Sequence, residues 1–295
     1  MSNVRSESLT VAIAAGKGGT GKTLVATSLA LALSRHAGRG VELLDCDVEE
    51  PNAHLLLHPR IVHRSEVTMR VPQVNRSVCT RCGVCADTCE FSAIAVIRDA
   101  VLTFPDLCAG CGACTYACPH DAIIETDRKV GVVEKGVTDE GIDFYAGRTE
   151  VGQQRSGLVT RAVKREIHPD MVSILDAPPG TACPMQEAIE DADFCLLVTE
   201  PTPFGLSDLK LAVETCRELE VPCGIVLNRD GVGDSGVEGY CRNEGLPLLM
   251  RIPHARSIAA AYSRGEALVS AQPDWAPRFH ELYEQIKARL GQRTG

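Results

Sequence analysis

The sequence predicts a doubly wound, mostly parallel α/β sheet with a small α+β unit inserted into it. Short apolar runs alternate with segments of helical periodicity along most of the 295 residues, as in a parallel sheet covered by helices. A glycine-rich stretch joins the first apolar run, residues 9–15, to the first helical pattern, residues 24–35. From about residue 70 to residue 130, this alternation gives way to two groups of cysteines.

The glycine-rich stretch, residues 16–23, reads Gly-Lys-Gly-Gly-Thr-Gly-Lys-Thr. Between a strand and a helix such a loop binds phosphate, because its backbone N–H groups and the positive end of the helix dipole converge on one anion. Lys22 supplies a charge for the terminal phosphates of a nucleotide, and the hydroxyl of Thr23 is placed to bind Mg²⁺. A glycine-rich turn without a ligand is the alternative.

Two later apolar runs end in acidic residues. Residues 41–44 lead into Asp45-Cys46-Asp47, and residues 171–175 lead into Asp176, with Gly180 shortly after it. The carboxyl ends of parallel strands meet at one edge of a sheet, so we expect these carboxylates beside the glycine-rich loop and near Mg²⁺. An Asp-x-Asp pair alone is often only a capped turn. The glycine-rich loop upstream favours a role in a nucleotide site over a capped turn for these aspartates.

The loop carries a second lysine, Lys17, directly after its first glycine. In this it resembles the deviant P-loop of the MinD/ParA/Mrp ATPases and of the nitrogenase iron protein, which have a P-loop NTPase fold of the MinD (SIMIBI) type. The resemblance covers residues 9–69 and 141–290. It implies that Lys17 reaches across an ATP-bound homodimer to the phosphates held by the partner.

The resemblance also implies roles for residues outside the loop. Asp47 would orient the attacking water, which makes it catalytic together with Lys17 and Lys22. Asp45 and Asp176 would support Mg²⁺ from its outer shell, and Gly180 would offer a free backbone N–H to the γ-phosphate. The expected nucleotide contacts are Gly16, Lys17, Gly18, Gly19, Thr20, Gly21, Lys22, Thr23, Asn52, Gly180 and, around the adenine, Asn228, Arg229 and Pro253.

The cysteine-rich segment repeats the spacing C-x₂-C-x₂-C-x₃-C. A short loop that presents three soft thiolates suits three corners of a [4Fe–4S] cube, and in two-cluster proteins each fourth cysteine binds the other cluster. Structural zinc sites usually pair two C-x₂-C knuckles instead, so zinc is the weaker alternative. The spacing predicts one cluster on Cys79, Cys82, Cys85 and Cys118, and a second on Cys108, Cys111, Cys114 and Cys89.

These signals divide the chain into a first ATPase part (residues 1–69), a ferredoxin-like insert (70–130) and a second ATPase part (131–295). Within the insert we expect short strands at residues 93–97 and 122–125. Beyond it we expect a return segment at 141–147, helices at 152–165, 207–220 with Ser207 as N-cap, and 273–290, and strands at 194–199, 223–227 and 248–252. The polar face of the last helix mixes Glu281 and Glu284 with Lys287, which favours packing on the sheet over membrane binding.

The composition limits the kinds of partner and the cellular compartment that we expect for this protein. The net charge of −9 argues against nucleic acid, and no apolar run is long enough for stable membrane insertion. The first eight residues lack an apolar signal-peptide region, so we expect a cytoplasmic protein, in which fourteen cysteines are unsuited to disulfides. Six cysteines lie outside the clusters. Most should be core residues, whereas Cys183, seven residues after Asp176, matches a cluster ligand of the nitrogenase iron protein and is a candidate interface thiol.

The sequence therefore predicts a Mg²⁺-dependent ATPase that binds ATP or ADP and carries two [4Fe–4S] clusters. Its ATP-driven homodimerisation would be coupled to electron transfer to a redox partner protein. The alternative is an ATPase for iron–sulfur cofactor assembly or partner positioning, in which the clusters are structural or sensory. An inactive ATPase attached to a ferredoxin is disfavoured by the intact Lys17, Lys22 and Asp47.

Overall fold

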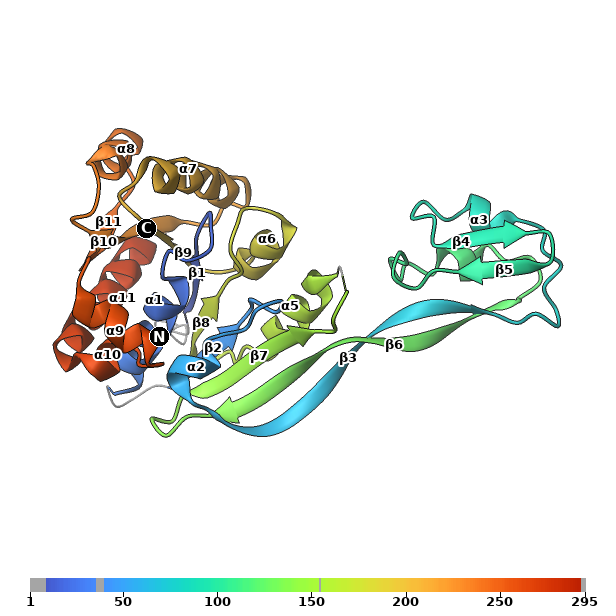
Figure 1. The fold of residues 1–295 in the computed structure, drawn as a ribbon, viewed down its shortest axis with the longest axis horizontal. Coiled ribbons are helices and arrows are strands. Elements are labelled where there is room, and N and C mark those ends of the chain that lie inside the picture. Colours follow the sequence, from blue (N-terminus) through green and yellow to red (C-terminus); the bar gives the residue numbers. More distant parts are fainter. Residues whose placement is uncertain (1–8, 36–39, 154, 293–295) are drawn as a thin grey trace, which may run out of the picture. The chain divides into compact units, whose positions relative to one another are not determined.

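The computed structural model describes residues 9–35, 40–153 and 155–292. The chain forms two compact units, shown in Figure 1. The first unit comprises Met1–Ser65, Val133–Arg148 and Ser156–Gly295; the second comprises Glu66–Val132 and Thr149–Arg155. All eight cysteines of the repeated spacing lie in the second unit, and the glycine-rich loop lies in the first.

One nine-stranded sheet organises the first unit. Each pair of neighbours from β11 to β7 is parallel, which confirms the predicted mostly parallel sheet. β1, which leads into the glycine-rich loop, lies between β8 and β9. In order across the sheet, the strands are β11 (Leu248–Pro253), β10 (Cys223–Asp230), β9 (Phe194–Thr199), β1 (Thr10–Ala14), β8 (Val172–Asp176), β2 (Val41–Asp45), β7 (Asp143–Thr149), β6 (Ile123–Val137) and β3 (Arg60–Val74).

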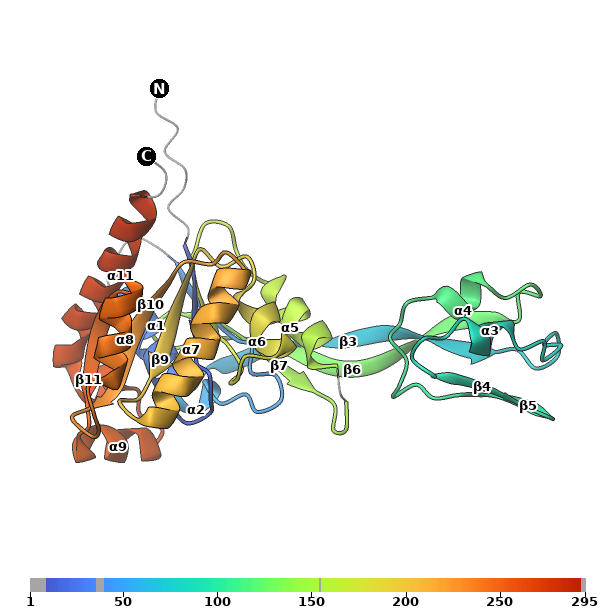
Figure 2. The same cartoon turned by 90° about the horizontal axis from the view of Figure 1, so that it is seen from above.

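Helices cover both faces of this sheet (Figures 1 and 2). On one face, Val11 and Ile13 of β1 join a core cluster with α1 and α11, while alternate residues such as Ala12 point to the other face. The first face carries α1 (Lys22–Ser34), α10 (Leu268–Ala271) and α11 (Ala276–Gly291), and the other carries α5 (Ser156–Lys164), α6 (Cys183–Ile189), α7 (Pro203–Glu218) and α8 (Gly236–Glu244). The remaining helical elements of this unit are α2 (His54–Leu57), α9 (Arg256–Ser263) and η1 (Pro273–Trp275).

The last helix packs into the core, as its pattern predicted. Phe279, Leu282, Tyr283 and Ile286 of α11 are all buried in the cluster that contains α1. Among the residues that the structure describes, no helix combines the length and the apolar character needed to cross a bilayer.

Two predicted helix starts were wrong. α7 begins at Pro203, four residues before Ser207, and its N-cap is Thr202, whose hydroxyl accepts a hydrogen bond from the Gly205 N–H at 3.0 Å. Proline suits the first turn of a helix because its missing N–H has no partner there, and this signal outweighed Ser207. α5 begins at Ser156 rather than at residue 152, because Gly152 has a left-handed backbone with φ of +80°.

The second unit is built from two halves that are related by a shift of 29 residues. The backbone is left-handed at equivalent positions, Arg81 and Gly110, Gly83 and Gly112, and Ser92 and Asp121. Equivalent hydrogen bonds run from Phe104 N–H to Ala93 C=O (2.8 Å) and from Asn75 N–H to Ala122 C=O (2.7 Å). The halves contain the single-turn helices α3 (Val84–Asp87) and α4 (Ala113–Tyr116), so the repeat in the cysteine spacing is also a repeat in backbone structure.

Strand pairing in the second unit differs in part from the prediction. Residues 93–97 contain β4 (Ile94–Ile97), which pairs antiparallel with β5 (Ala100–Thr103). Residues 123–125 are extended, as predicted, but they are the first residues of the fifteen-residue β6 and not a separate short strand. β6 and its neighbour β3 each contribute residues to both units.

The corrected cap of α7 makes a prediction about stability. Thr202→Ala removes the side-chain acceptor for the Gly205 N–H, and we expect a loss of about 1 kcal/mol in the free energy of unfolding. Ser207→Ala is the matched control, because Ser207 is exposed inside the helix and should leave the stability nearly unchanged. Urea unfolding followed by circular dichroism measures both variants; equal losses would mean that the Thr202 hydroxyl is not the cap.

Candidate functional site

The glycine-rich loop leaves β1 and enters α1 with little room for side chains. At Gly16, a Cβ atom would collide with the backbone of Asp208 in α7. Gly21 has φ of +98°, and the amide of Asn228 occupies the space that a side chain would need. Lys22 and Thr23 follow in the first turn of α1, and both are buried. The loop is therefore held against α7 and β10 by close backbone approach.

Two carboxylates lie side by side at the carboxyl edge of the sheet. Asp45 ends β2 and Asp176 ends β8, and the two residues are direct partners in the register of these parallel strands. Both are buried, and Ile13 of β1 is the partner of Asp176 on its other side. This is the arrangement that the two strand-end aspartates predicted.

The environments of these carboxylates differ. By distance and angle, neither carboxylate oxygen of Asp176 accepts a hydrogen bond among the described residues. Burial raises the pKa of Asp176 to about 6, and the charge of Lys22 and the nearby Thr23 hydroxyl offset part of that rise. A buried carboxylate is costly unless hydrogen bonds, a cation or the waters around a cation satisfy it. The carboxylate of Asp176 therefore suits hydrated Mg²⁺.

Asp45 instead holds the loop that follows it. Its carboxylate accepts hydrogen bonds from the backbone N–H groups of Asp47 (3.2 Å), Asn52 (2.9 Å) and Ala53 (2.9 Å). Burial, and next the charge of Asp176, raise the pKa of Asp45 well above its usual range. Burial also raises the pKa of Asp47, and nearby Lys22 acts against that rise. Asp45 thus positions Asp47 and Asn52, a role that the sequence did not reveal.

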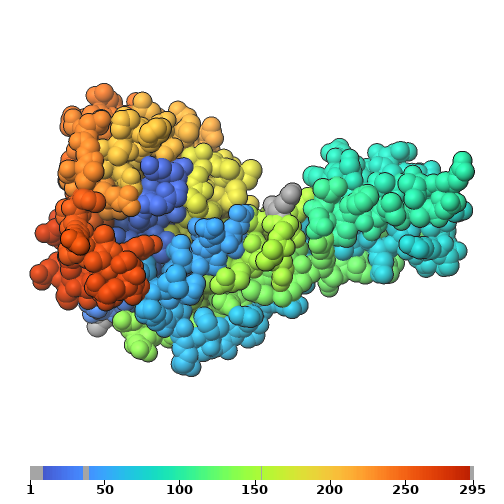
Figure 3. Space-filling model, viewed as in Figure 1, coloured from blue at the N-terminus to red at the C-terminus, as the bar shows by residue number. Residues whose placement is uncertain are grey.

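A pocket of about 380 Å³ opens beside the loop. Its size falls within the range of small-ligand sites. In Figure 3 the blue atoms of the N-terminal region reach the surface between the gold and red-orange segments. Eight of the expected nucleotide residues line this pocket, namely Gly19, Gly21, Lys22, Thr23, Asn52, Asn228, Arg229 and Pro253.

One wall of the pocket consists of residues that the sequence did not lead us to expect. Six further lining residues are Leu24, His254, Ala255, Ile258, Ala259 and Tyr262, most of them on or just before α9. The run of small and apolar residues at 258–261 was visible in the sequence, but no motif marked it as a ligand surface. Gly16, Lys17, Gly18, Thr20 and Gly180 are not among the residues that line this pocket.

One detail of the predicted site was wrong in this conformation. Gly180 was expected to offer a free N–H group to the γ-phosphate. Its N–H donates a hydrogen bond to the Ala15 carbonyl at 3.0 Å. Gly180 also has a left-handed backbone (φ +98°), so this contact ties the segment after β8 to the start of the glycine-rich loop. A backbone change at Gly180 would be needed to free the donor.

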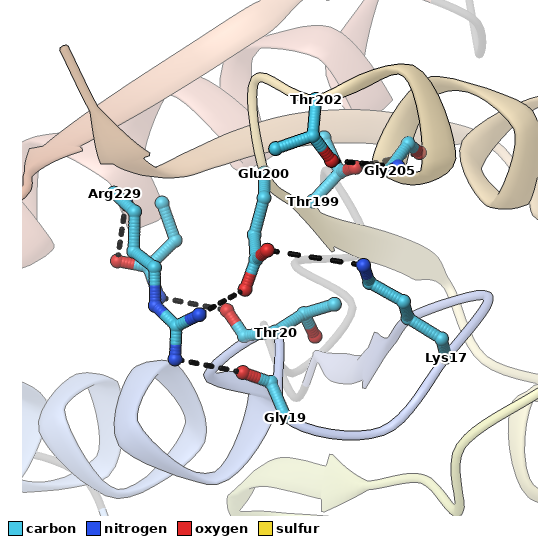
Figure 4. Close-up of polar contacts among 9 residues, drawn as sticks. Lys17, Gly19, Thr20, Thr199, Glu200, Thr202, Gly205 and Arg229 are labelled. Atoms are coloured by element: carbon cyan, nitrogen blue, oxygen red, sulfur yellow. Dashed lines mark hydrogen bonds and ion pairs between the residues drawn. The ribbon is translucent and has the colours of Figure 1, made fainter. Parts of the chain in front are cut away.

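A buried acidic residue that no motif indicated lies on the other side of the loop (Figure 4). Glu200, directly after β9, faces the Arg229 guanidinium at 2.7 Å and the Lys17 ammonium at 3.8 Å. Arg229 also donates a hydrogen bond to the Gly19 carbonyl (3.3 Å), and the Asn228 amide donates one to the Thr20 carbonyl (2.7 Å). Asn228 and Arg229 therefore hold the loop itself, in addition to lining the pocket.

The eight clustered cysteines sort into two sets of four. One small pocket of the second unit is lined by Cys79, Cys82, Cys85 and Cys118, and another by Cys89, Cys108, Cys111 and Cys114. Each set therefore combines three cysteines of one half with the fourth of the other half.

Backbone N–H groups donate hydrogen bonds to three of the cysteine sulfurs. The N–H groups of Ala93, Gly110 and Ala122 donate to the sulfurs of Cys89, Cys108 and Cys118, each at 3.3 Å. Burial raises the pKa of the equivalent thiols Cys85 and Cys114. In the described part of the chain, no three His, Cys, Asp or Glu side chains lie together as ligands of a single metal ion. A cube differs in this respect, because its four thiolates bind four different iron atoms.

The six other cysteines follow the predicted division. Cys46, Cys195, Cys216 and Cys241 are buried, and Cys223 is partly buried. Cys183 is exposed at the first position of α6, in the first unit.

The burial of the Asp176 carboxylate predicts how the stability of the protein depends on pH. Its pKa is about 6 in the folded protein against an ordinary value of 3.8, so the nucleotide-free protein should lose stability as the pH rises from about 4 to about 6. At pH 7.5, Asp176→Asn should therefore raise the free energy of unfolding, by roughly 1–3 kcal/mol. The same variant should lose the contribution of Mg²⁺ to nucleotide affinity.

Urea unfolding at pH 4.5 and at pH 7.5, and ADP binding with and without Mg²⁺, check this prediction. Asp193→Asn is a control carboxylate on the surface, away from the pocket. A wild type that is as stable at pH 7.5 as at pH 4.5, with no gain for Asp176→Asn, would contradict the uncompensated burial of this group.

Known proteins share this architecture. The chain is 31% identical over 279 residues to an uncharacterized protein of Methanocaldococcus jannaschii, covering 94% of this chain and 96% of that protein. It is 24% identical over 306 residues to a cytosolic Fe-S cluster assembly factor homolog of Caenorhabditis briggsae, covering 95% of this chain and 80% of that one. The fold is similar to that of the septum site-determining protein MinD of Pyrococcus horikoshii in complex with Mg-ADP, with a TM-score of 0.57, 20% identity, and coverage of 95% and 96%.

The family assignment rests on a match along most of the chain. Residues 11–269, which include the glycine-rich loop, both strand-end aspartates and the wall formed by α9, match the family model of the CobQ/CobB/MinD/ParA nucleotide binding domain. The chain therefore belongs to the CobQ/CobB/MinD/ParA family of nucleotide-binding P-loop proteins.

Proposed function

We propose that this protein is a Mg²⁺-dependent ATPase whose ATP-driven homodimerisation is coupled to electron transfer through two [4Fe–4S] clusters to a partner protein. The observation that carries the proposal is the division of eight cysteines into two sets of four, in the same chain as a complete P-loop site. Membership of the nucleotide-binding family supports the ATPase half. The cluster half rests on the thiols and on the backbone around them.

In the proposed ATPase site, Lys22 and the loop N–H groups bind the phosphates of ATP held by the same subunit. Thr23 binds Mg²⁺ and Asp176 accepts hydrogen bonds from its water shell, while Asp45 fixes the loop that carries Asp47. Asp47 orients the water for in-line attack on the γ-phosphate. Its raised pKa and its neighbour Lys22 are compatible with a group that accepts a proton from that water.

The residues of the second unit fit two four-iron clusters. Each set offers four thiols around one small pocket, and N–H groups that already point at sulfur are the donors that tune the potential of such clusters. When bound, the clusters supply one-electron redox chemistry. Cys82 and Cys111, at equivalent positions of the two halves, are exposed, which gives an electron partner access to both sets.

Iron–sulfur cofactor assembly is the second candidate function. It is favoured by one observation, the 24% identity along most of the chain to a protein named as a cytosolic Fe-S cluster assembly factor. In that case the ATPase would drive transfer of clusters or positioning of a partner, and the reduction potentials of the resident clusters would not respond to nucleotide.

Lys17 and Lys22 should have separable effects. Lys22 is buried at the start of α1 and lines the pocket, so Lys22→Ala should weaken ATP binding directly. Lys17 does not line the pocket of its own subunit, so Lys17→Ala should bind ATP as a monomer, fail to dimerise, and lose most turnover. Light scattering with ATP and Mg²⁺, beside nucleotide-binding and phosphate-release assays, measures the three properties. A Lys17→Ala protein that dimerises and turns over normally would remove Lys17 from the mechanism.

The clusters predict a defined iron content. Anaerobically purified protein should contain about eight iron atoms per chain, and Cys82→Ala or Cys111→Ala should each lose about four while nucleotide binding persists. Cys183→Ala is the matched control, an exposed thiol outside both sets whose loss should leave the iron content unchanged. Iron analysis and electron paramagnetic resonance measure these quantities, and a colourless zinc protein would contradict the assignment.

The same samples separate the two candidate functions. In the electron-transfer proposal, ATP shifts the reduction potential of at least one cluster, because dimer closure changes its surroundings. Potentials that do not change with ATP, together with release of iron and sulfide to an apo-ferredoxin acceptor, would favour the assembly function.

A further inference from the structure

Glu200 is a buried carboxylate that each subunit places between two cations. About 11% of its side chain is exposed. One carboxylate oxygen faces the Arg229 guanidinium at 2.7 Å, and the other faces the Lys17 ammonium at 3.8 Å (Figure 4). The shorter contact is a charge-assisted hydrogen bond, whereas the longer one is a looser ion pair.

The backbone around Glu200 is fixed. Its carbonyl accepts the Thr202 N–H at 2.8 Å, and Thr202 caps α7 through the Gly205 N–H. The Thr199 hydroxyl donates to the Gly205 carbonyl at 2.9 Å, and a Cβ atom at Gly205 would collide with the Glu200 carbonyl. Because its backbone is held in this way, the Glu200 carboxylate cannot follow the Lys17 side chain if that side chain moves away.

Arg229 is fixed on the opposite side. Its backbone is left-handed (φ +55°), and its N–H donates to the side chain of Asn228 at 2.9 Å. Its guanidinium bridges Glu200 and the Gly19 carbonyl. Lys17 is the less firmly held cation of this group, because its one polar contact among the described residues is the 3.8 Å ion pair to Glu200, whereas Arg229 also binds the Gly19 carbonyl.

We propose that Glu200 is a positioning residue that holds Lys17 within its own subunit and releases it when the ATP-loaded dimer closes. This inference rests on the proposed action of Lys17 across the dimer. Each lysine exchanges one negative partner for another, from the Glu200 carboxylate to the phosphates held by the partner subunit. Dimer closure must therefore overcome the Glu200–Lys17 attraction twice, once in each subunit.

Arg229 makes the release possible. A buried carboxylate that lost its only cation would be strongly destabilised. When Lys17 leaves, Glu200 keeps its closer contact with Arg229, so the carboxylate stays compensated. The pair of cations thus separates two tasks: Arg229 keeps Glu200 and the loop in place, and Lys17 responds to the partner's nucleotide.

The test is the ATP dependence of dimerisation in Glu200→Gln, which keeps the shape of the side chain and removes its charge. A partly exposed ion pair is worth roughly a two- to fivefold change in equilibrium, so release in both subunits should strengthen dimerisation about 4- to 25-fold. Light scattering of the full protein with Mg²⁺ and increasing ATP measures the dimer constant. Binding of a fluorescent ATP analogue at protein concentrations too low for dimers corrects for any change in nucleotide affinity.

Two control variants assign the effect to Lys17. Arg229→Gln removes the closer partner of Glu200 and leaves the Lys17–Glu200 pair, so it should not strengthen dimerisation. The double variant Lys17→Ala/Glu200→Gln should stay monomeric, because the released lysine is the group that joins the subunits. Should Glu200→Gln fail to fold, Glu200→Asp keeps the charge and shortens the side chain by one methylene group. The already longer contact to Lys17 should weaken first, so the dimer constant should change in the same direction.

The outcomes are distinct for the two proposals. If wild type does not dimerise with ATP, the proposed action of Lys17 across a dimer fails. If wild type dimerises but Glu200→Gln dimerises equally or less well, Glu200 does not restrain Lys17 and this inference is overturned. An equal gain in Arg229→Gln would overturn it too, because the effect would then come from the loop and not from Lys17.

Discussion

The nucleotide site depends on the burial of two carboxylates at the edge of one parallel sheet. Asp45 and Asp176 are register partners, so the fold brings like charges together where water is excluded. Asp45 is satisfied by three backbone N–H groups of the following loop, whereas Asp176 accepts no backbone hydrogen bond among the described residues and its burial is offset only in part by Lys22 and Thr23. The fold therefore stores a local electrostatic cost that a bound cation can relieve, and this relief links nucleotide binding to the stability of the sheet edge.

In the second unit, a short segment of chain holds eight thiols in fixed positions. Its core is small, and several of the residues in it are cysteines of the two sets. Its two halves repeat the same left-handed positions and the same backbone hydrogen bonds, so one local solution is used twice. Exchange of the fourth cysteine between the halves joins them, because neither set is complete within one half.

The sequence was most informative where a residue type recurs at a fixed interval or closes an apolar run. The aspartates at strand ends and the grouping of the eight cysteines were readable in this way, whereas the roles of these residues as ligands stay predictions. The start of α7 was missed because Thr202 and Ser207 are both good caps, and only the fold selects between them. Glu200 and the α9 wall were missed because the loop residues that they meet, such as Lys17 and Gly19, lie far from them in the chain, and no local pattern encodes such contacts. The occupied N–H of Gly180 was missed for the same reason.

The strands β3 and β6 show how the cysteine-rich segment is attached to the first unit. Ser65 and Val133, the residues of the first unit on either side of the segment, are close enough for the Ser65 hydroxyl to donate to the Val133 carbonyl at 3.5 Å. A chain that omitted the residues between them could join these two positions with a short β-hairpin turn and leave the parallel sheet intact. Segment 66–132 therefore joins the first unit through one pair of neighbouring strands, so its length and content could change while the strands that carry the nucleotide site keep their places.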